Sequence, residues 1–378
     1  MKFPLAWHRL WAIVLKEFIQ MRRDRITFAM MVGIPLIQLV LFGFAINTDP
    51  KRLPTVIFDA DQSTYSRSFV ASLENSGYFD MLTPPATIAE ARNAMAIGNV
   101  QFIVSIPPDF SRSLVRGEKP ALLLEADASD PAATGNAISA LSNLNQSALQ
   151  HDLNGPLAPL GSTSPPFEIR VQRNYNPEGI TQYNIVPGLM GTILTMTMIM
   201  MTGMAMTREL ERGTLENLLA FPVHPLEVMI GKILPFIMVG YIQVTVILTA
   251  AYFLFSVPIA GSLPMLLACV LVFLAANLTV GMMFSTIAKS QLQAMQMTFF
   301  FFLPSMLLSG FMFPFRGMPY WAQVIGEGLP LTHFLRIVRG IMLKGNGWAE
   351  TWPNVWPLLV FMTVVMLIGF KRYRKTLD

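Results

Sequence analysis

The chain has 378 residues, of which 53% are hydrophobic and only 13% are charged. Soluble domains contain roughly 25% charged residues, so this composition excludes an ordinary soluble protein and indicates a membrane protein. The formal net charge of +4 is small, and most of it lies at the two ends of the chain. This distribution favours a role in membrane orientation and argues against nucleic acid as a partner.

Residues 1–25 predict a cytoplasmic interfacial helix. Trp7, Trp11 and Phe18 recur at helical spacing opposite polar residues, which is typical of a helix that lies on a membrane surface. A cluster of three arginines follows, and residues 26–46 are long and apolar enough to form a first transmembrane helix. Because basic residues mark the cytoplasmic side of a span, the amino terminus is predicted to be cytoplasmic.

Residues 47–178 change to the composition of a soluble domain, and we predict an α/β domain on the periplasmic side. Alternating apolar residues and turn signals predict its elements. The expected strands are 53–58, 101–106, 121–126 and 167–172, and the expected helices are 63–76, 88–97, 110–116 and 132–153.

Residues 179–378 predict a domain of five further transmembrane helices. The apolar stretches are 180–206, 233–256, 263–288, 292–313 and 355–370. With the first span they make six, which returns the basic carboxyl terminus to the cytoplasm. Residues 314–345 are too polar to span a membrane and too apolar for a free loop, so we expect an outer re-entrant hairpin there. The predicted fold is therefore a membrane α-helical protein with six transmembrane helices, an inserted extracytoplasmic α/β domain and an amino-terminal interfacial helix.

Candidates for catalysis or metal binding are few. Asp59 and Asp61 follow an apolar strand as in one class of phosphatases, but the later Gly-Asp metal motif is missing, so capping of the next helix by Asp61 or Ser63 is the simpler interpretation. The four histidines are scattered, which predicts no metal site. The sequence also lacks a G-x-x-x-x-G-K-[ST] phosphate loop, so we predict no catalytic residues and no bound cofactor in this chain.

The energy source must then be a gradient or another subunit. Carboxylates inside the membrane are the usual mark of ion coupling, and Glu327 is the only candidate near the predicted spans. This weighs against a gradient-driven secondary transporter, which stays open as an alternative. A second alternative is a non-transporting scaffold that binds a periplasmic partner through the α/β domain.

The most polar connection between the later spans is 208–232, which the span count places in the cytoplasm. Strong helix formers predict a short helix over 208–220. Pro222 then breaks the chain, and Pro225 is well placed to open a second helix.

At this connection the sequence resembles the permeases of type-2 ABC exporters, in particular bacterial drug-efflux permeases with a large domain between the first two spans. The family pattern R-E-x-E-x-G-T-x-E-x-L-L is met by Arg208, Glu209, Glu211, Gly213, Thr214, Glu216, Leu218 and Leu219. A second pattern, P-x-x-P-x-E-x-x-x-G-K, is met by Pro222, Pro225, Glu227, Gly231 and Lys232. A later L-P-x-T-H-F motif is present at Leu329, Pro330, Thr332, His333 and Phe334.

The resemblance implies a multi-pass permease of a bacterial inner membrane, with both termini cytoplasmic. It implies a homodimer or a heterodimer with a similar permease, a separate ABC ATPase subunit that binds ATP and Mg, and a periplasmic adaptor of the membrane-fusion type. The residues expected to couple to the ATPase are Arg208, Glu209, Glu211, Arg212, Gly213, Thr214, Glu216, Pro222, Pro225 and Glu227. The expected substrate is amphipathic, such as a drug, a bile-salt-like molecule or a lipid.

Within the predicted spans, polar contacts for such a substrate are limited. The candidates for the substrate pathway are Asn184, Gln243, Asn277 and Gln296, among generic apolar side chains.

Overall fold

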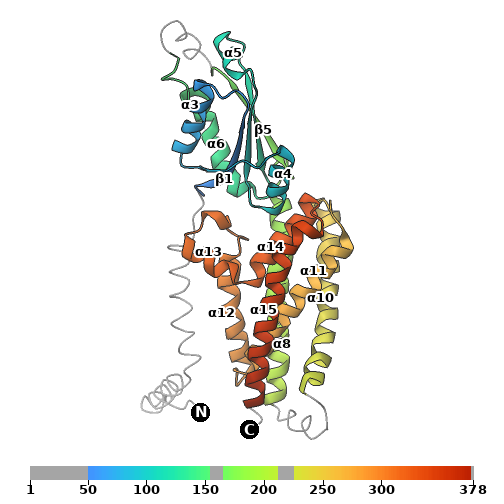
Figure 1. Ribbon diagram of the computed structural model, residues 1–378. Coiled ribbons are helices and arrows are strands. Elements are labelled where there is room, and N and C mark those ends of the chain that lie inside the picture. The colour runs from blue at the N-terminus through green and yellow to red at the C-terminus, as the bar shows by residue number, and fades with distance from the viewer. Residues whose placement is uncertain (1–49, 154–164, 212–224, 376–378) are drawn as a thin grey trace, which may run out of the picture.

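The computed structural model describes residues 50–153, 165–211 and 225–375, which form an α/β domain stacked on the end of a bundle of long helices (Figure 1). The predicted interfacial helix 1–25 and the first predicted span 26–46 lie outside these residues, as does most of the predicted helix 208–220. A hairpin of short helices lies between the α/β domain and the bundle.

The α/β domain is built on one five-stranded sheet with the strand order β2-β1-β3-β4-β5. The strands are β1 (Leu53–Asp59), β2 (Phe79–Leu82), β3 (Phe102–Ile106), β4 (Ala121–Asp127) and β5 (Glu168–Asn174). Only β3 and β4 pair in antiparallel fashion; the other neighbours are parallel. Strand β2 was not predicted, because its four residues alternate in polarity over too short a run to be distinguished from a turn.

In the described part of this domain, four helices accompany the sheet: α3 (Thr64–Asn75), α4 (Ile88–Ile97), α5 (Phe110–Val115) and α6 (Pro131–Ser147). Their apolar faces and the sheet bury a core that includes Phe69, Phe102, Phe110 and Phe167. Helix α6 ends six residues earlier than the predicted helix 132–153.

The two aspartates after β1 have a local structural role. Asp59 accepts hydrogen bonds from the backbone N–H groups of Asp61 and Gln62 and from the Ser66 hydroxyl. Asp61 accepts from the N–H and hydroxyl of Ser111. Helix α3 is capped by Ser63, whose hydroxyl accepts from the N–H of Ser66, so the capping interpretation is confirmed with Ser63 as the cap.

The helical bundle contains α8 (Thr181–Glu211), α10 (Pro225–Phe255), α11 (Leu263–Ser285), α12 (Gln291–Leu308) and α15 (Trp348–Lys375). Within the described residues, four helices are long and apolar enough to cross a membrane: Thr181–Arg208, Pro235–Phe255, Leu263–Ser285 and Trp348–Gly369. Helix α12 is not among them. It ends at Leu308, before the predicted limit of residue 313, because Gly310 takes a left-handed conformation with φ +82° and the chain turns.

Residues 315–344 form a helical hairpin that packs on the bundle. It consists of η3 (Phe315–Gly317), α13 (Tyr320–Glu327), α14 (Pro330–Arg339) and η4 (Gly340–Lys344), a single turn of π-helix. Helix α14 is largely buried and shares the main core with α8 and α11. Phe334 of α14 stacks on Phe273 of α11, with ring centroids 3.9 Å apart.

Candidate functional site

A polar cleft of about 590 Å³ separates the α/β domain from the hairpin and the bundle. We call it the interdomain cleft. Its walls are the end of α4, the segment from β4 to α6, and residues of α13, α14, η4 and α15. Charged side chains from both domains line it, including Asp127, Asp130, Arg316, Arg339 and Lys344.

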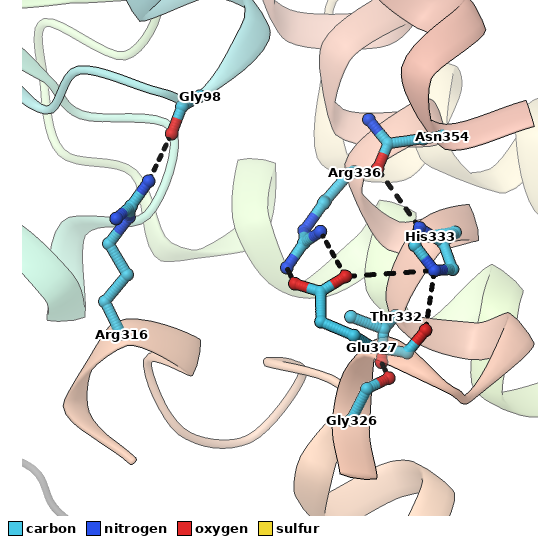
Figure 2. Close-up of polar contacts among 8 residues, drawn as sticks. All are labelled: Gly98, Arg316, Gly326, Glu327, Thr332, His333, Arg336 and Asn354. Carbon is cyan, nitrogen blue, oxygen red and sulfur yellow. Dashed lines mark hydrogen bonds and ion pairs between the residues drawn. The ribbon is translucent and has the colours of Figure 1, made fainter. Parts of the chain in front are cut away.

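The two domains are joined across this cleft by polar contacts, most of them partly buried. The Nζ of Lys344 lies 2.6 Å from the Oδ2 of Asp127 and donates to the carbonyl of Met95 at 3.2 Å. Asn346 donates to the carbonyl of Ala96, and Arg316 donates to the carbonyl of Gly98 at 2.6 Å (Figure 2). The hairpin is therefore attached mainly to the carbonyl groups at the end of α4.

Helix α4 is itself held to the sheet by an ion pair. Arg92 donates from Nε and Nη2 to the carboxylate of Glu125 on β4, at 2.9 and 2.7 Å, and Asn174 donates to the same carboxylate. The Glu125 side chain is buried, and the hydrogen bonds from Arg92 hold its pKa below the usual value despite that burial. This pair fixes the end of α4 that receives the hairpin contacts.

The L-P-x-T-H-F motif joins α13 to α14. Pro330 occupies the first turn of α14, where a missing N–H costs nothing. The Thr332 hydroxyl donates to the carbonyl of Gly326 at 2.7 Å, and His333 Nε2 lies 2.9 Å from the carbonyl of Glu327 (Figure 2). Because a carbonyl only accepts, Nε2 is the donor in this contact. The motif thus gives the carbonyl of Glu327 a donor and adds a second donor to the carbonyl of Gly326, which already accepts from the N–H of Leu329.

Glu327 is engaged by a neighbouring cation. Arg336 donates to both of its carboxylate oxygens, at 3.0 and 2.6 Å (Figure 2). Nδ1 of His333 lies 3.3 Å from Oδ1 of Asn354 on α15. Glu327, the carboxylate that the sequence singled out near the predicted spans, therefore belongs to the polar junction of the hairpin and is paired with Arg336.

At the opposite end of the bundle, the last turn of α8 is tied to the first residue of α12. Gln291 donates from its backbone N and its Nε2 to the carboxylate of Glu211, at 2.8 and 2.6 Å. Its Oε1 accepts from the Nε of Arg208 at 3.2 Å. We call these three residues the α8–α12 latch. It sits where the predicted coupling stretch begins, so a displacement of that stretch would reach two long helices at once.

The comparisons with known proteins give the family. Residues 25–371 match the family described as "ABC-2 family transporter protein". The chain belongs to the ABC-2 family. It is 28% identical over 369 residues to the probable multidrug ABC transporter permease YbhR of Escherichia coli K12, covering 98% of this chain and 99% of that protein. It is 29% identical to the probable multidrug ABC transporter permease YbhS, covering 97% and 96%.

A more distant relative is longer. ABC transporter G family member 20 of Dictyostelium discoideum is 24% identical over 97% of this chain, but the match covers only 51% of that protein. The resemblance to ABC exporter permeases that the motifs predict is confirmed by the family match. This chain is accordingly a multi-pass membrane permease of the ABC-2 family.

The coupling residues predicted for this ABC-2 permease lie only in part within the described residues. Arg208, Glu209 and Glu211 belong to the end of α8, and Pro225 opens α10 as predicted, with Glu227 in its first turn. Five others lie outside the described residues: Arg212, Gly213, Thr214, Glu216 and Pro222. Their role in coupling stays a prediction.

The four residues predicted for the substrate pathway do not come together. Asn184 lies beside the α/β domain and donates to Oδ1 of Asp130 at 2.8 Å. Gln243 of α10 accepts from the hydroxyl of Thr197 on α8 at 3.0 Å. Asn277 donates to the carbonyl of Phe273 in its own helix, and Oε1 of Gln296 is buried without a hydrogen-bond partner among the described residues. None of the four lines the interdomain cleft.

The sequence analysis missed two contacts of the ABC-2 permease: the α8–α12 latch at Gln291 and the ion pair of Lys344 with Asp127. Gln291 carries no motif, and its partners Arg208 and Glu211 lie about eighty positions away. Lys344 and Asp127 are 217 positions apart. Only the isolated polar residues Lys344 and Asn346 directly after an apolar run could have suggested a contact with another domain.

Proposed function

We propose that this ABC-2 permease is the membrane subunit of an ATP-driven exporter in a bacterial inner membrane. The observation that carries the proposal is the nearly full-length match to permeases named for multidrug transport. Its substrate is amphipathic, such as a drug, a bile-salt-like molecule or a lipid. The substrate contacts polar side chains as it passes between the spans, including Asn184, Gln243, Asn277 and Gln296.

The ATP is hydrolysed by a separate ABC ATPase subunit. The sequence has no phosphate loop. The match to the Dictyostelium relative covers 51% of that protein, so about half of its chain lies outside the match. The ATPase holds ATP and Mg, and this chain holds neither. The working unit is a dimer of this permease or a heterodimer with a similar one, and a membrane-fusion adaptor docks on the α/β domain.

The topology consistent with this assembly has six spans, with both termini and the stretch 208–220 in the cytoplasm. Residues 1–25 lie on the inner membrane surface, residues 26–46 make the first span, and the α/β domain is periplasmic. The support is the pattern of basic residues and apolar stretches in the sequence.

The α8–α12 latch supports a route for the energy. A rigid-body movement of the coupling stretch would displace the end of α8, and the hydrogen bonds to Gln291 would carry α12 with it. Helix α12 leads directly to the hairpin, whose Arg316 and Lys344 contact the α/β domain. Nucleotide-driven movement at one end of the bundle would in this way reach the other end.

The test is ATP coupling in coupling-stretch variants. Glu216→Lys and Gly213→Pro should leave the protein inserted in the membrane but reduce both pull-down of the ATPase subunit and substrate-stimulated ATP hydrolysis. Glu74→Lys, an exposed change on α3 of the α/β domain, is the matched control and should change neither quantity. Normal pull-down and normal stimulated hydrolysis in both coupling variants would remove the role assigned to this stretch.

The same preparation separates the alternatives. Export by vesicles that persists without the ATPase subunit and collapses with the proton gradient would identify a gradient-driven carrier. A complete lack of substrate flux in both conditions would favour a scaffold.

A further inference from the structure

The Arg339 side chain presents unused hydrogen-bond donors at the interdomain cleft. It lines the cleft from α14, and its Nη1 donates to the carbonyl of Gly310 at 3.1 Å. Its Nε and Nη2 are buried and have no hydrogen-bond partner among the described residues. A buried cationic donor without a partner is costly, so its presence indicates a group that is absent from the chain itself.

A second cation of the cleft has no carboxylate partner among the described residues. Arg316, an exposed side chain, donates to the carbonyl of Gly98 and forms no ion pair there. By contrast, Lys344 and Arg336 are matched by Asp127 and Glu327. Of the four cations that line the cleft, Arg316 and Arg339 are therefore the two that form no ion pair among the described residues.

The carboxylate that faces Arg339 neutralises it poorly. Asp130 caps α6 and accepts hydrogen bonds from the N–H of Ala132 and the amide of Asn184. Burial raises the pKa of Asp130, which opposes the charged form of this side chain. The charges of Asp130 and Arg339 attract each other, but among the described residues Nε and Nη2 of Arg339 form no hydrogen bond with this carboxylate.

The cleft also has an apolar wall. Phe315, Ile337, Trp356 and Pro357 line it beside the arginines. Its volume of about 590 Å³ lies within the range of small-molecule sites, which is about 300–1,000 Å³. A ligand that fits both surfaces has an acidic group and an apolar body.

We propose that the interdomain cleft binds an amphipathic anion. Its carboxylate, sulfate or phosphate accepts hydrogen bonds from Arg339 and Arg316, and its apolar part lies along Phe315, Ile337 and Trp356. The ligand is either a soluble amphiphile or the head group of an anionic phospholipid with part of its chains. Binding at this site needs no ATPase subunit, so it can be tested apart from the export reaction.

The test uses the full chain in nanodiscs of neutral phosphatidylcholine without nucleotide. The probe is dansyl-labelled undecanoic acid, and its uncharged methyl ester is the control ligand. Fluorescence titration should show saturable binding of the acid and much weaker binding of the ester. Arg339→Gln and Arg316→Gln should each weaken binding of the acid by about 10- to 100-fold, the expected effect of losing a charge-assisted hydrogen bond.

Two control variants make the result decisive. Arg116→Gln removes an exposed arginine of the α/β domain and should leave the affinity unchanged. Arg339→Lys keeps the charge and should retain more affinity than Arg339→Gln. If Arg339→Gln does not fold, Arg316→Gln and Arg339→Lys decide the matter.

Addition of phosphatidylglycerol to the nanodiscs distinguishes the sources of the ligand. Displacement of the probe by this lipid supports binding of a phospholipid head group, and retention of the probe supports a soluble amphiphile. The proposal is overturned if acid and ester bind equally, or if the arginine variants bind the acid as the wild type does. The binding measurements use no nucleotide and no ATPase subunit, so they keep their meaning even if this chain does not support ATP-driven export.

Discussion

Gly281→Ala should weaken the contact between α11 and α8, whereas Gly203→Ala at the same contact should not. A Cβ at position 281 would lie 2.7 Å from the carbonyl oxygen of Ile199, 2.9 Å from Cβ of Thr202 and 3.2 Å from the backbone N of Gly203. Two of these atoms belong to the backbone of a helix and cannot rotate away. A Cβ at position 203 would lie 3.5 Å from the carbonyl of Gly281, an ordinary contact.

The expected size follows from two opposing terms. Adding a methyl group to a tightly packed contact costs about 1–3 kcal/mol. Replacing glycine by alanine inside a helix contributes about 1 kcal/mol of stabilisation. Gly203→Ala should therefore be neutral or more stable by up to about 1 kcal/mol, and Gly281→Ala should be less stable than Gly203→Ala by about 1–3 kcal/mol.

The assay is thermal unfolding of the two variants, purified in the same detergent as the wild-type chain. The helix-propensity term is common to both variants, so the difference between them measures the contact alone. ATP-dependent export measured in parallel should fall for Gly281→Ala, because α8 carries the latch to α12. An unfolding temperature for Gly281→Ala equal to or above that of Gly203→Ala would refute the proposed close approach of the two helices.

Three further predictions concern the ion pairs. Arg92 lowers the pKa of Glu125 below 4.5, so the ion pair stabilises the folded domain fully above about pH 4.5, and this stabilisation is lost as the pH falls through the lowered pKa. Glu125→Gln should remove this acid-dependent part of the stability from unfolding curves followed by tyrosine fluorescence. Lys344→Met leaves the buried carboxylate of Asp127 without its cation and should cost about 3–5 kcal/mol in thermal unfolding, and an unchanged midpoint would contradict this. Glu327→Gln breaks a half-exposed pair and should cost under about 1 kcal/mol, with export still driven by ATP; export lost while ATP hydrolysis continues would instead favour ion coupling.

Local sequence patterns predicted several features of the candidate site. The helix that opens at Pro225 could be predicted because proline limits the backbone wherever it occurs. The break predicted at Pro222 lies outside the described residues. The L-P-x-T-H-F motif was also visible, but its role was not. That role depends on carbonyl groups of α13, which Thr332 and His333 reach only after the hairpin has formed.

Composition and apolar periodicity by themselves determined that this is a membrane protein and where most of its strands and long helices lie. These properties depend on neighbouring residues, and a chain carries them before it folds. Only the tertiary structure decided the limit of α12, the α8–α12 latch at Gln291, and the junction of Lys344 with Asp127. It also decided that two buried donors of Arg339, beside the cleft, have no hydrogen-bond partner among the residues that the structure describes. Such contacts join residues far apart in the chain, and their geometry is set by how helices and sheet pack.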